Sequence, residues 1–151
     1  MPARNRRRPF GKRGFTLIET VIILAVLGIL LIVGSHSLLS VAPRYRLETA
    51  AGEIRTGLNA ARFKAIFETT SVRVRFSGGG FSTERYDSEN GVWTFVSRKV
   101  LEGVRIEANN APIFTAMGTV SGLATITVSN TWGAYKITLA ISGRIKTLRA
   151  G

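Results

Sequence analysis

Hydrophobic and polar positions divide the chain into three stretches with different periods. Residues 15–33 are almost continuously apolar, residues 44–68 repeat apolar positions every three or four residues, and residues 70–150 contain segments that alternate with period two. The first pattern is typical of a membrane helix, the second predicts an amphipathic helix, and the third predicts half-buried strands. The sequence therefore predicts a long N-terminal helix followed by β-structure, an α+β fold.

The apolar run is long enough to cross a membrane. It contains 19 residues, from residue 15 to residue 33, and at about 1.5 Å per residue it spans about 29 Å, close to a hydrocarbon core of about 30 Å. We expect a transmembrane and assembly helix over residues 15–42. His36, the only histidine, is expected to be an interfacial residue of this helix.

The helix is expected to continue into a globular head, residues 43–151. Over residues 44–68 most charged positions fall off the apolar stripe, so this half is expected to pack one face against an antiparallel sheet over residues 70–150. Pro43 lacks a backbone donor and is expected to kink or briefly break the helix. The apolar stripe consists of Leu47, Ala51, Ile54, Leu58, Ala61 and Ala65.

Alternation and turn residues predict seven or eight short strands in the head. Asn90-Gly91 marks a hairpin turn in a somewhat longer loop, and Ser142-Gly143 marks a second hairpin between the last two strands. Gly78, Gly79 and Gly80 follow a strand and have no lysine after them, so they predict a turn and not a phosphate loop. The candidate segments for these seven or eight strands lie near residues 72–77, 81–86, 92–96, 99–101, 104–107, 113–116, 124–128, 135–141 and 144–148.

One acid interrupts the apolar run, and a basic leader precedes it. A carboxylate such as Glu19 costs about 2.5 to 3.5 kcal/mol at the centre of a bilayer, so it needs a partner. Residues 1–14 contain six bases and no acid, and their removal lowers the formal charge from +12 to +6. Positive charge before a first membrane segment favours a cytoplasmic N-terminus and an exported C-terminal part. A plain membrane anchor explains the apolar run but not Glu19, and a nucleic-acid or nuclear-targeting arm is the rival interpretation of the leader.

Residues 11–34, GKRGFTLIETVIILAVLGILLIVG, resemble the class III signal of type IV prepilins and type II secretion pseudopilins. The resemblance implies that a prepilin peptidase cleaves between Gly14 and Phe15 and methylates the new N-terminus. Glu19 is then the fifth residue of the mature chain, which in this family pairs with the N-terminal amine of a neighbouring subunit. The implied partners are the peptidase, other major and minor pilins or pseudopilins, an inner-membrane assembly platform, and membrane lipid before assembly.

The head resembles the GspH/FimT group of minor pseudopilins and pilins. The similar segments are LNAARFKAIFETTSVRVRFSG, residues 58–78, and ISGRIKTLR, residues 141–149. This resemblance implies a pilin-like fold and two alternative functions. Secretion members are minor subunits near the tip of a periplasmic pseudopilus that supports protein export. FimT-like members belong to type IV pili, and some bind DNA for uptake through a basic C-terminal G-R-x-R pattern.

The charge distribution keeps the DNA alternative open. All nine acids lie at or before Glu107, whereas residues 108–151 contain four bases. Arg144 and Lys146 are expected on one face of the last strand, with Ile145 toward the core, and together with Arg149 they are the candidate nucleic-acid contacts. An ordinary solvated strand face is the other interpretation. Phosphate contacts weaken with salt, so binding of residues 44–151 to duplex DNA at several salt concentrations separates the two.

No enzyme or cofactor motif is recognisable in the sequence. The chain has no cysteine and one histidine, and it lacks a phosphate-binding loop and a nucleophile elbow, so we expect neither an enzyme nor a bound cofactor or metal. Glu84, Asp87 and Glu89 are expected on a loop, but three acids alone are weak evidence for calcium. The expected function is a minor pseudopilin subunit of the inner membrane and periplasm.

Overall fold

The computed structural model describes residues 15–150, and at residues 33–40 it describes only the backbone. The leader and Gly14 therefore lie outside the described residues, as does the side chain of His36. The chain divides into two compact units, Met1–Leu38 and Leu39–Gly151, which are described one at a time.

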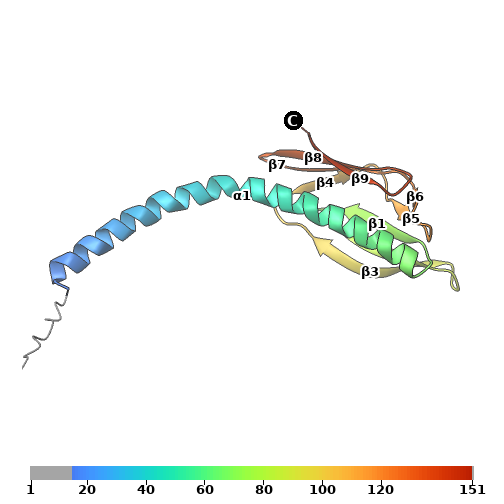
Figure 1. The fold of residues 1–151 in the computed structure, drawn as a ribbon, viewed down its shortest axis with the longest axis horizontal. Coiled ribbons are helices and arrows are strands. Elements are labelled where there is room, and N and C mark those ends of the chain that lie inside the picture. Colours follow the sequence, from blue (N-terminus) through green and yellow to red (C-terminus); the bar gives the residue numbers. More distant parts are fainter. Residues whose placement is uncertain (1–14, 151) are drawn as a thin grey trace, which may run out of the picture. The chain divides into compact units, whose positions relative to one another are not determined.

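One long helix and nine strands make up the described secondary structure (Figure 1). The predicted α+β class is confirmed. The elements are α1 (Leu17–Phe67), β1 (Val72–Ser77), β2 (Gly80–Asp87), β3 (Val92–Val100), β4 (Arg105–Ala108), β5 (Ile113–Phe114), β6 (Val120–Ser121), β7 (Thr125–Asn130), β8 (Gly133–Leu139) and β9 (Ile145–Ala150).

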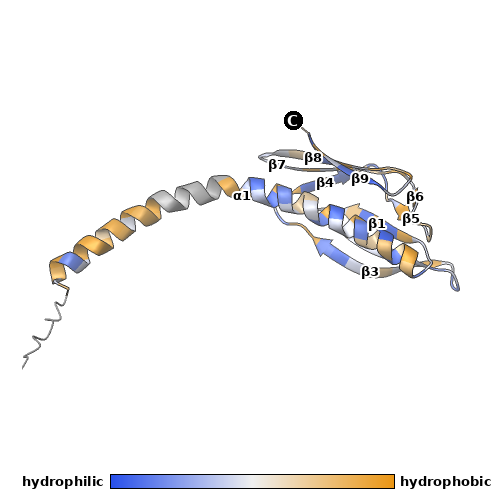
Figure 2. Ribbon diagram, in the orientation of Figure 1, coloured by the Kyte–Doolittle hydropathy of each residue, from blue (hydrophilic) through white to orange (hydrophobic). Residues whose placement is uncertain are grey.

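Helix α1 runs through Pro43 without interruption, so the predicted break is wrong. A proline removes only one helical hydrogen bond, because the missing donor is its own N–H. At this turn the Asn130 side chain donates from Nδ2 to the carbonyl oxygen of Pro43 at 2.6 Å. This bond ties the proline turn to the end of β7. In Figure 2 the described start of the helix is mainly apolar, whereas polar residues interrupt its second half.

The strands form two antiparallel sheets in the Leu39–Gly151 unit. The first has the order β3-β2-β1-β5-β6 and the second the order β4-β7-β8-β9. Strands of both sheets lie along the second half of α1 (Figure 1). The predicted hairpin across Ser142-Gly143 is confirmed, because β8 pairs with β9 in a register that places Leu139 opposite Ile145.

The predicted apolar stripe of the helix forms one wall of the core. All six of its residues are at most 5% exposed. The sheets supply the other walls, with Val72 and Val74 from β1, Ile126 and Val128 from β7, and Ile137 from β8, all completely buried. Each fully buried aliphatic side chain of this kind contributes about 1.5 to 3 kcal/mol. The head is therefore held together by the burial of one helix face between two sheets.

Two strand predictions differ from the structure. The segments expected near residues 92–96 and 99–101 form the single edge strand β3, and the register with β2 shifts between Thr83 and Glu84. Such a bulge shifts the alternation, which is why the one strand resembled two. The two-residue strand β6, which pairs with β5, was not predicted. Two residues are too few to show a period.

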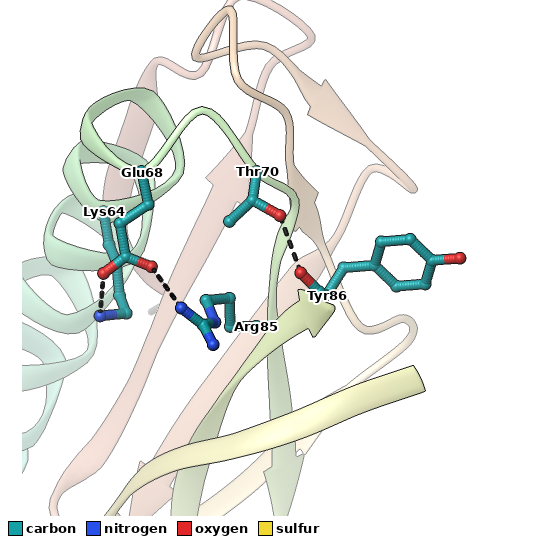
Figure 3. Close-up of polar contacts among 5 residues, drawn as sticks. All are labelled: Lys64, Glu68, Thr70, Arg85 and Tyr86. Carbon is teal, nitrogen blue, oxygen red and sulfur yellow. Dashed lines mark hydrogen bonds and ion pairs between the residues drawn. The ribbon is translucent and has the colours of Figure 1, made fainter. Parts of the chain in front are cut away.

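The C-terminal end of α1 is fixed by a turn and by contacts with β2 (Figure 3). Thr69 has a positive φ of 52°, and Thr70 N–H donates to the carbonyl of Ala65 at 3.1 Å, the bond of a Schellman motif. The Glu68 carboxylate lies between Lys64 Nζ at 2.6 Å and Arg85 Nη1 at 3.7 Å. Thr70 Oγ1 donates to the carbonyl of Tyr86 at 2.8 Å, so the helix end and β2 are tied together.

The contacts of Glu68 predict an acid-sensitive contribution to stability. The hydrogen bond from Lys64, with the charges of Lys64 and Arg85, lowers the pKa of Glu68 below the ordinary value of 4.5 despite partial desolvation. A lowered folded-state pKa stabilises the fold above pH 4.5, and this contribution is lost as the pH falls through the folded-state pKa. Glu68→Gln is expected to cost about 1 kcal/mol at pH 7 and less at lower pH. Denaturant unfolding of both proteins between neutral and acidic pH measures this.

Glu89→Gln is the control for this prediction, because Glu89 lies in the exposed turn after β2. It is expected to unfold like the parent protein across the same pH range. If the free energy of unfolding changed with pH equally in Glu68→Gln and in the parent protein, the stabilising role of the Glu68 contacts would be contradicted.

Candidate functional site

The first turn of α1 is capped by a threonine. Thr16 Oγ1 accepts a hydrogen bond from the backbone N–H of Glu19 at 3.3 Å, and Thr20 Oγ1 donates to the carbonyl of Thr16 at 3.2 Å. Thr16 was not among the predicted site residues, although the spacing Thr-x-x-Glu is the sequence signal of a capping box. The cap fixes where the helix begins, and so it fixes the position of Glu19 in the first turn.

Glu19 is an exposed carboxylate on an apolar helix surface. A negative charge in the first turn interacts favourably with the helix dipole. Within residues 15–150, no cationic group lies within ion-pair distance of Glu19. Its neighbours Phe15, Leu17 and Ile18 are 76%, 83% and 65% exposed. In the part of the chain that the structure describes, the helix start therefore presents a carboxylate without a cationic partner next to exposed apolar side chains.

Among the described residues, no helix meets both the length and the apolarity needed to cross a membrane.

The last strand does not bring the three predicted basic residues to one surface. Arg144 and Lys146 are exposed and Ile145 is half-buried, as the alternation predicts. Arg149 lies three positions after Lys146 on a regular strand, so it lies on the opposite face. Its guanidinium carbon is 4.1 Å from the ring centroid of Trp132. The grouping of Arg149 with the other two therefore does not hold in the structure.

The glycine of the Gly143-Arg144-Ile145-Lys146 segment has a packing role. Gly143 has a φ of 79°, and a Cβ there would lie 2.5 Å from the carbonyl oxygen of Gly118 and 2.8 Å from the guanidinium carbon of Arg62. Arg62 Nη1 donates to the carbonyl of Gly143 at 3.4 Å. The turn between β8 and β9 thus packs against α1, and only a glycine fits there.

The three acids considered for calcium are engaged separately. Glu84 lies in β2, not in a loop, and accepts a hydrogen bond from Arg73 Nε at 2.8 Å. Asp87, at the end of β2, accepts bonds from the side chain of Asn90 and the backbone of Glu89, which lower the pKa of Asp87. The three acids therefore do not converge on one point.

Comparison with known proteins shows a match for the N-terminal segment and a match for the fold. Residues 10–35 match the family model described as the prokaryotic N-terminal methylation motif. The fold matches the minor pseudopilin EpsH from the type 2 secretion system of Vibrio cholerae, with a TM-score of 0.59 and 14% identity over 69% of this chain and 97% of that one. The described head has a pilin-like fold.

A second match comes from a pilus. The type IV minor pilin FimU of Pseudomonas aeruginosa has a TM-score of 0.56 and 19% identity over 68% of this chain and 88% of that one. No curated protein matches the chain. At these identities the solved structures establish the pilin-like fold, and they include a secretion protein and a pilus protein alike.

Proposed function

We propose that this pilin-like chain is a minor subunit of a type II secretion pseudopilus, or of a related type IV pilus, which joins the filament near its tip and supports protein export. The observation that carries the proposal is Glu19. Its carboxylate has no cation at ion-pair distance among the described residues, and it lies on an exposed apolar part of the helix, inside a segment that matches the N-terminal methylation motif.

Cleavage after Gly14 would supply the missing cation. The cut creates a free amine at Phe15, and an amine of a neighbouring subunit can pair with Glu19. In an apolar surrounding a lone charge costs several kcal/mol, so only the register that pairs the two groups is stable. Apolar side chains such as Ile22, Leu24, Val26 and Leu30, which are between 51% and 63% exposed in the single chain, would then pack against neighbouring helices. The pair sets the register, and the apolar surface supplies the cohesion.

Before assembly, lipid would have to cover the exposed apolar side chains of the helix. We place residues 15–42 in the inner membrane, with the N-terminus in the cytoplasm and the head in the periplasm. The assembly platform would lift the subunit from the bilayer into the filament, where neighbouring helices replace lipid around the apolar side chains.

The DNA-uptake alternative stays a prediction with less support. Of its three residues, Arg144 and Lys146 remain on the exposed side of the last strand, whereas Arg149 lies against Trp132. Lys136 of β8 projects from the same exposed face as Lys146. Two or three exposed bases are also what an ordinary solvated strand carries.

The processing step tests the proposed function directly. The full chain is produced in cells with and without a prepilin peptidase, and its intact mass and N-terminal sequence are measured. With the peptidase, the mature chain is expected to begin at an N-methylated Phe15, and Gly14→Leu is expected to block the change. A chain that keeps residues 1–14 in the presence of an active peptidase would contradict the proposal.

A further inference from the structure

Basic and aromatic side chains gather at the beginning of the head unit. Arg44 and Arg46 come from α1, Arg105 from β4, Trp132 from the turn between β7 and β8, and Arg149 from β9. We call these five residues the basal cluster. They are far apart in the sequence, and contacts at Pro43, Arg46 and Trp132 bring them to the same turns of α1.

Trp132 holds two of the arginines. The guanidinium carbons of Arg149 and Arg44 lie 4.1 Å and 5.3 Å from its ring centroid. The Trp132 backbone N–H donates to Asn130 Oδ1 at 2.9 Å, and Asn130 in turn donates to Pro43. The indole is therefore positioned by the same residue that ties β7 to the helix. Its ring attracts the two cations, while the cations repel each other.

The positive charge of the cluster is only partly neutralised. Arg44 pairs with Glu48 at 3.0 Å and Arg105 with Glu107 at 2.8 Å. Within the described part of the chain, Arg46 and Arg149 have no carboxylate at ion-pair distance. The cluster therefore retains two positive charges that an external anion can neutralise.

A hollow next to Asn130 and Thr131 combines one of these two charges, that of Arg46, with apolar walls. It has a volume of about 580 Å³, and Arg46 and Arg105 line it together with Pro43 and Val104. The Arg46 side chain lies against Gly103, where a Cβ would come within 3.0 Å of Arg46 Cδ. The hollow thus has room for a small anionic group with an attached apolar part.

We propose that the basal cluster binds the anionic phospholipid headgroups of the membrane that contains the subunit before assembly. Arg46 and Arg149 contact lipid phosphates, and Trp132 and Tyr45, which is 69% exposed, lie at the headgroup level. The inference rests on the proposed function, because it takes residues 15–42 to be in the bilayer. The fork of arginine suits phosphate, and tryptophan and tyrosine favour the membrane interface.

The place of the cluster in the chain favours lipid over other anions. Arg44 and Arg46 follow the apolar run within about four helical turns, so a head on a membrane-embedded helix keeps them near the surface. A nucleic acid needs a longer row of bases, since its affinity grows with each phosphate contacted. Before assembly the cluster would hold the head against the membrane. It would release the head when residues 15–42 are lifted out of the bilayer.

Vesicle binding by the head tests the inference. Residues 39–151 form a compact unit with their own core, so the head can be produced alone. Sedimentation with phosphatidylcholine vesicles, with and without phosphatidylglycerol, is measured at low and at physiological salt. Binding is expected only with phosphatidylglycerol, and it is expected to weaken with salt.

Charge-matched variants distinguish the cluster from net charge. Arg46→Ala with Arg149→Ala is expected to lower vesicle partitioning about thirtyfold, and Arg46→Ala alone, which leaves the Trp132 contacts intact, about fivefold. Lys136→Ala with Lys146→Ala removes the same charge from the other face of β8 and β9 and is expected to change partitioning less than about twofold.

Three outcomes would overturn the inference. The first is that the head shows no phosphatidylglycerol-dependent binding. The second is that both double variants lose vesicle binding equally. The third is that Arg46→Ala with Arg149→Ala, the basal-cluster variant, loses binding to duplex DNA but keeps binding to vesicles. The full-length basal-cluster variant is still expected to be cleaved after Gly14. Normal cleavage without vesicle binding therefore refutes only this inference, whereas failed cleavage refutes the proposed function.

Discussion

Glu19→Ala is expected to leave membrane insertion and cleavage after Gly14 intact and to lower incorporation into the filament by about a hundredfold or more. Removing one partner of a buried ion pair costs about 3 to 5 kcal/mol, because the other charge is left without compensation. In the proposed assembly that other charge is the Phe15 amine of a neighbouring subunit. Alanine removes the carboxylate and keeps a good helix former in the first turn.

Incorporation is measured by co-purification of the full chain with the major subunit after cross-linking in cells. Glu19→Gln keeps the size and polarity of the side chain without its charge, so it is expected to fail nearly as completely as alanine. Glu48→Ala removes an exposed glutamate that pairs with Arg44 and is expected to incorporate normally. If Glu19→Ala entered the filament as efficiently as the parent protein, the assembly role of Glu19 would be refuted.

Gly143→Ala is expected to destabilise the head by about 3 kcal/mol, from strain and overpacking together. The φ of 79° is unfavourable for a residue with a side chain, and the added methyl would meet the backbone oxygen of Gly118 at 2.5 Å. The Arg62 guanidinium, which donates to Gly143, would also have to move. If the turn shifted to move the methyl group away from the Gly118 oxygen, it would therefore press against Arg62 of α1.

Gly133→Ala is the matched control, because a Cβ at Gly133 has no neighbour within 4 Å and its φ is not positive. Denaturant unfolding of residues 39–151 is expected to show a change of less than about 0.5 kcal/mol for this variant. Similar stabilities for the two variants would contradict the packing role of Gly143. A confirmed difference assigns the glycine of the Gly143-Arg144 pair to folding, so its presence alone is no evidence for DNA contact.

The local patterns of the sequence determined the order and kind of the main elements. The spacing of Leu47, Ile54 and Leu58 predicted which face of the helix is buried, and the structure confirms it. Alternation near residues 72–77 and the turn at Ser142-Gly143 predicted a strand and a hairpin that the structure also contains. These features depend on neighbours within one or two turns, so their signal is present in any short window.

Strand boundaries and the continuity of the helix were harder to predict. The bulge opposite Thr83 and Glu84 merges two expected strands into one, because a register shift is visible only when the partner strand is known. Pro43 remains in the helix, where Asn130 contacts it across 87 positions of the chain. A helix-breaking residue is tolerated when tertiary contacts hold the turn, and a propensity scale contains no such information.

The methylation motif, the apolar run with Glu19 and the order of helix and strands could all be recognised before folding, because each depends on consecutive residues. Which basic side chains lie close together depends on the tertiary structure. It separated Arg149 from Lys146 by strand pleating and brought it to Trp132 and Arg44. It also showed that Gly143 is required by contacts with Gly118 and Arg62. Such surfaces combine residues from several elements, and their proximity arises only when the sheets close over the helix.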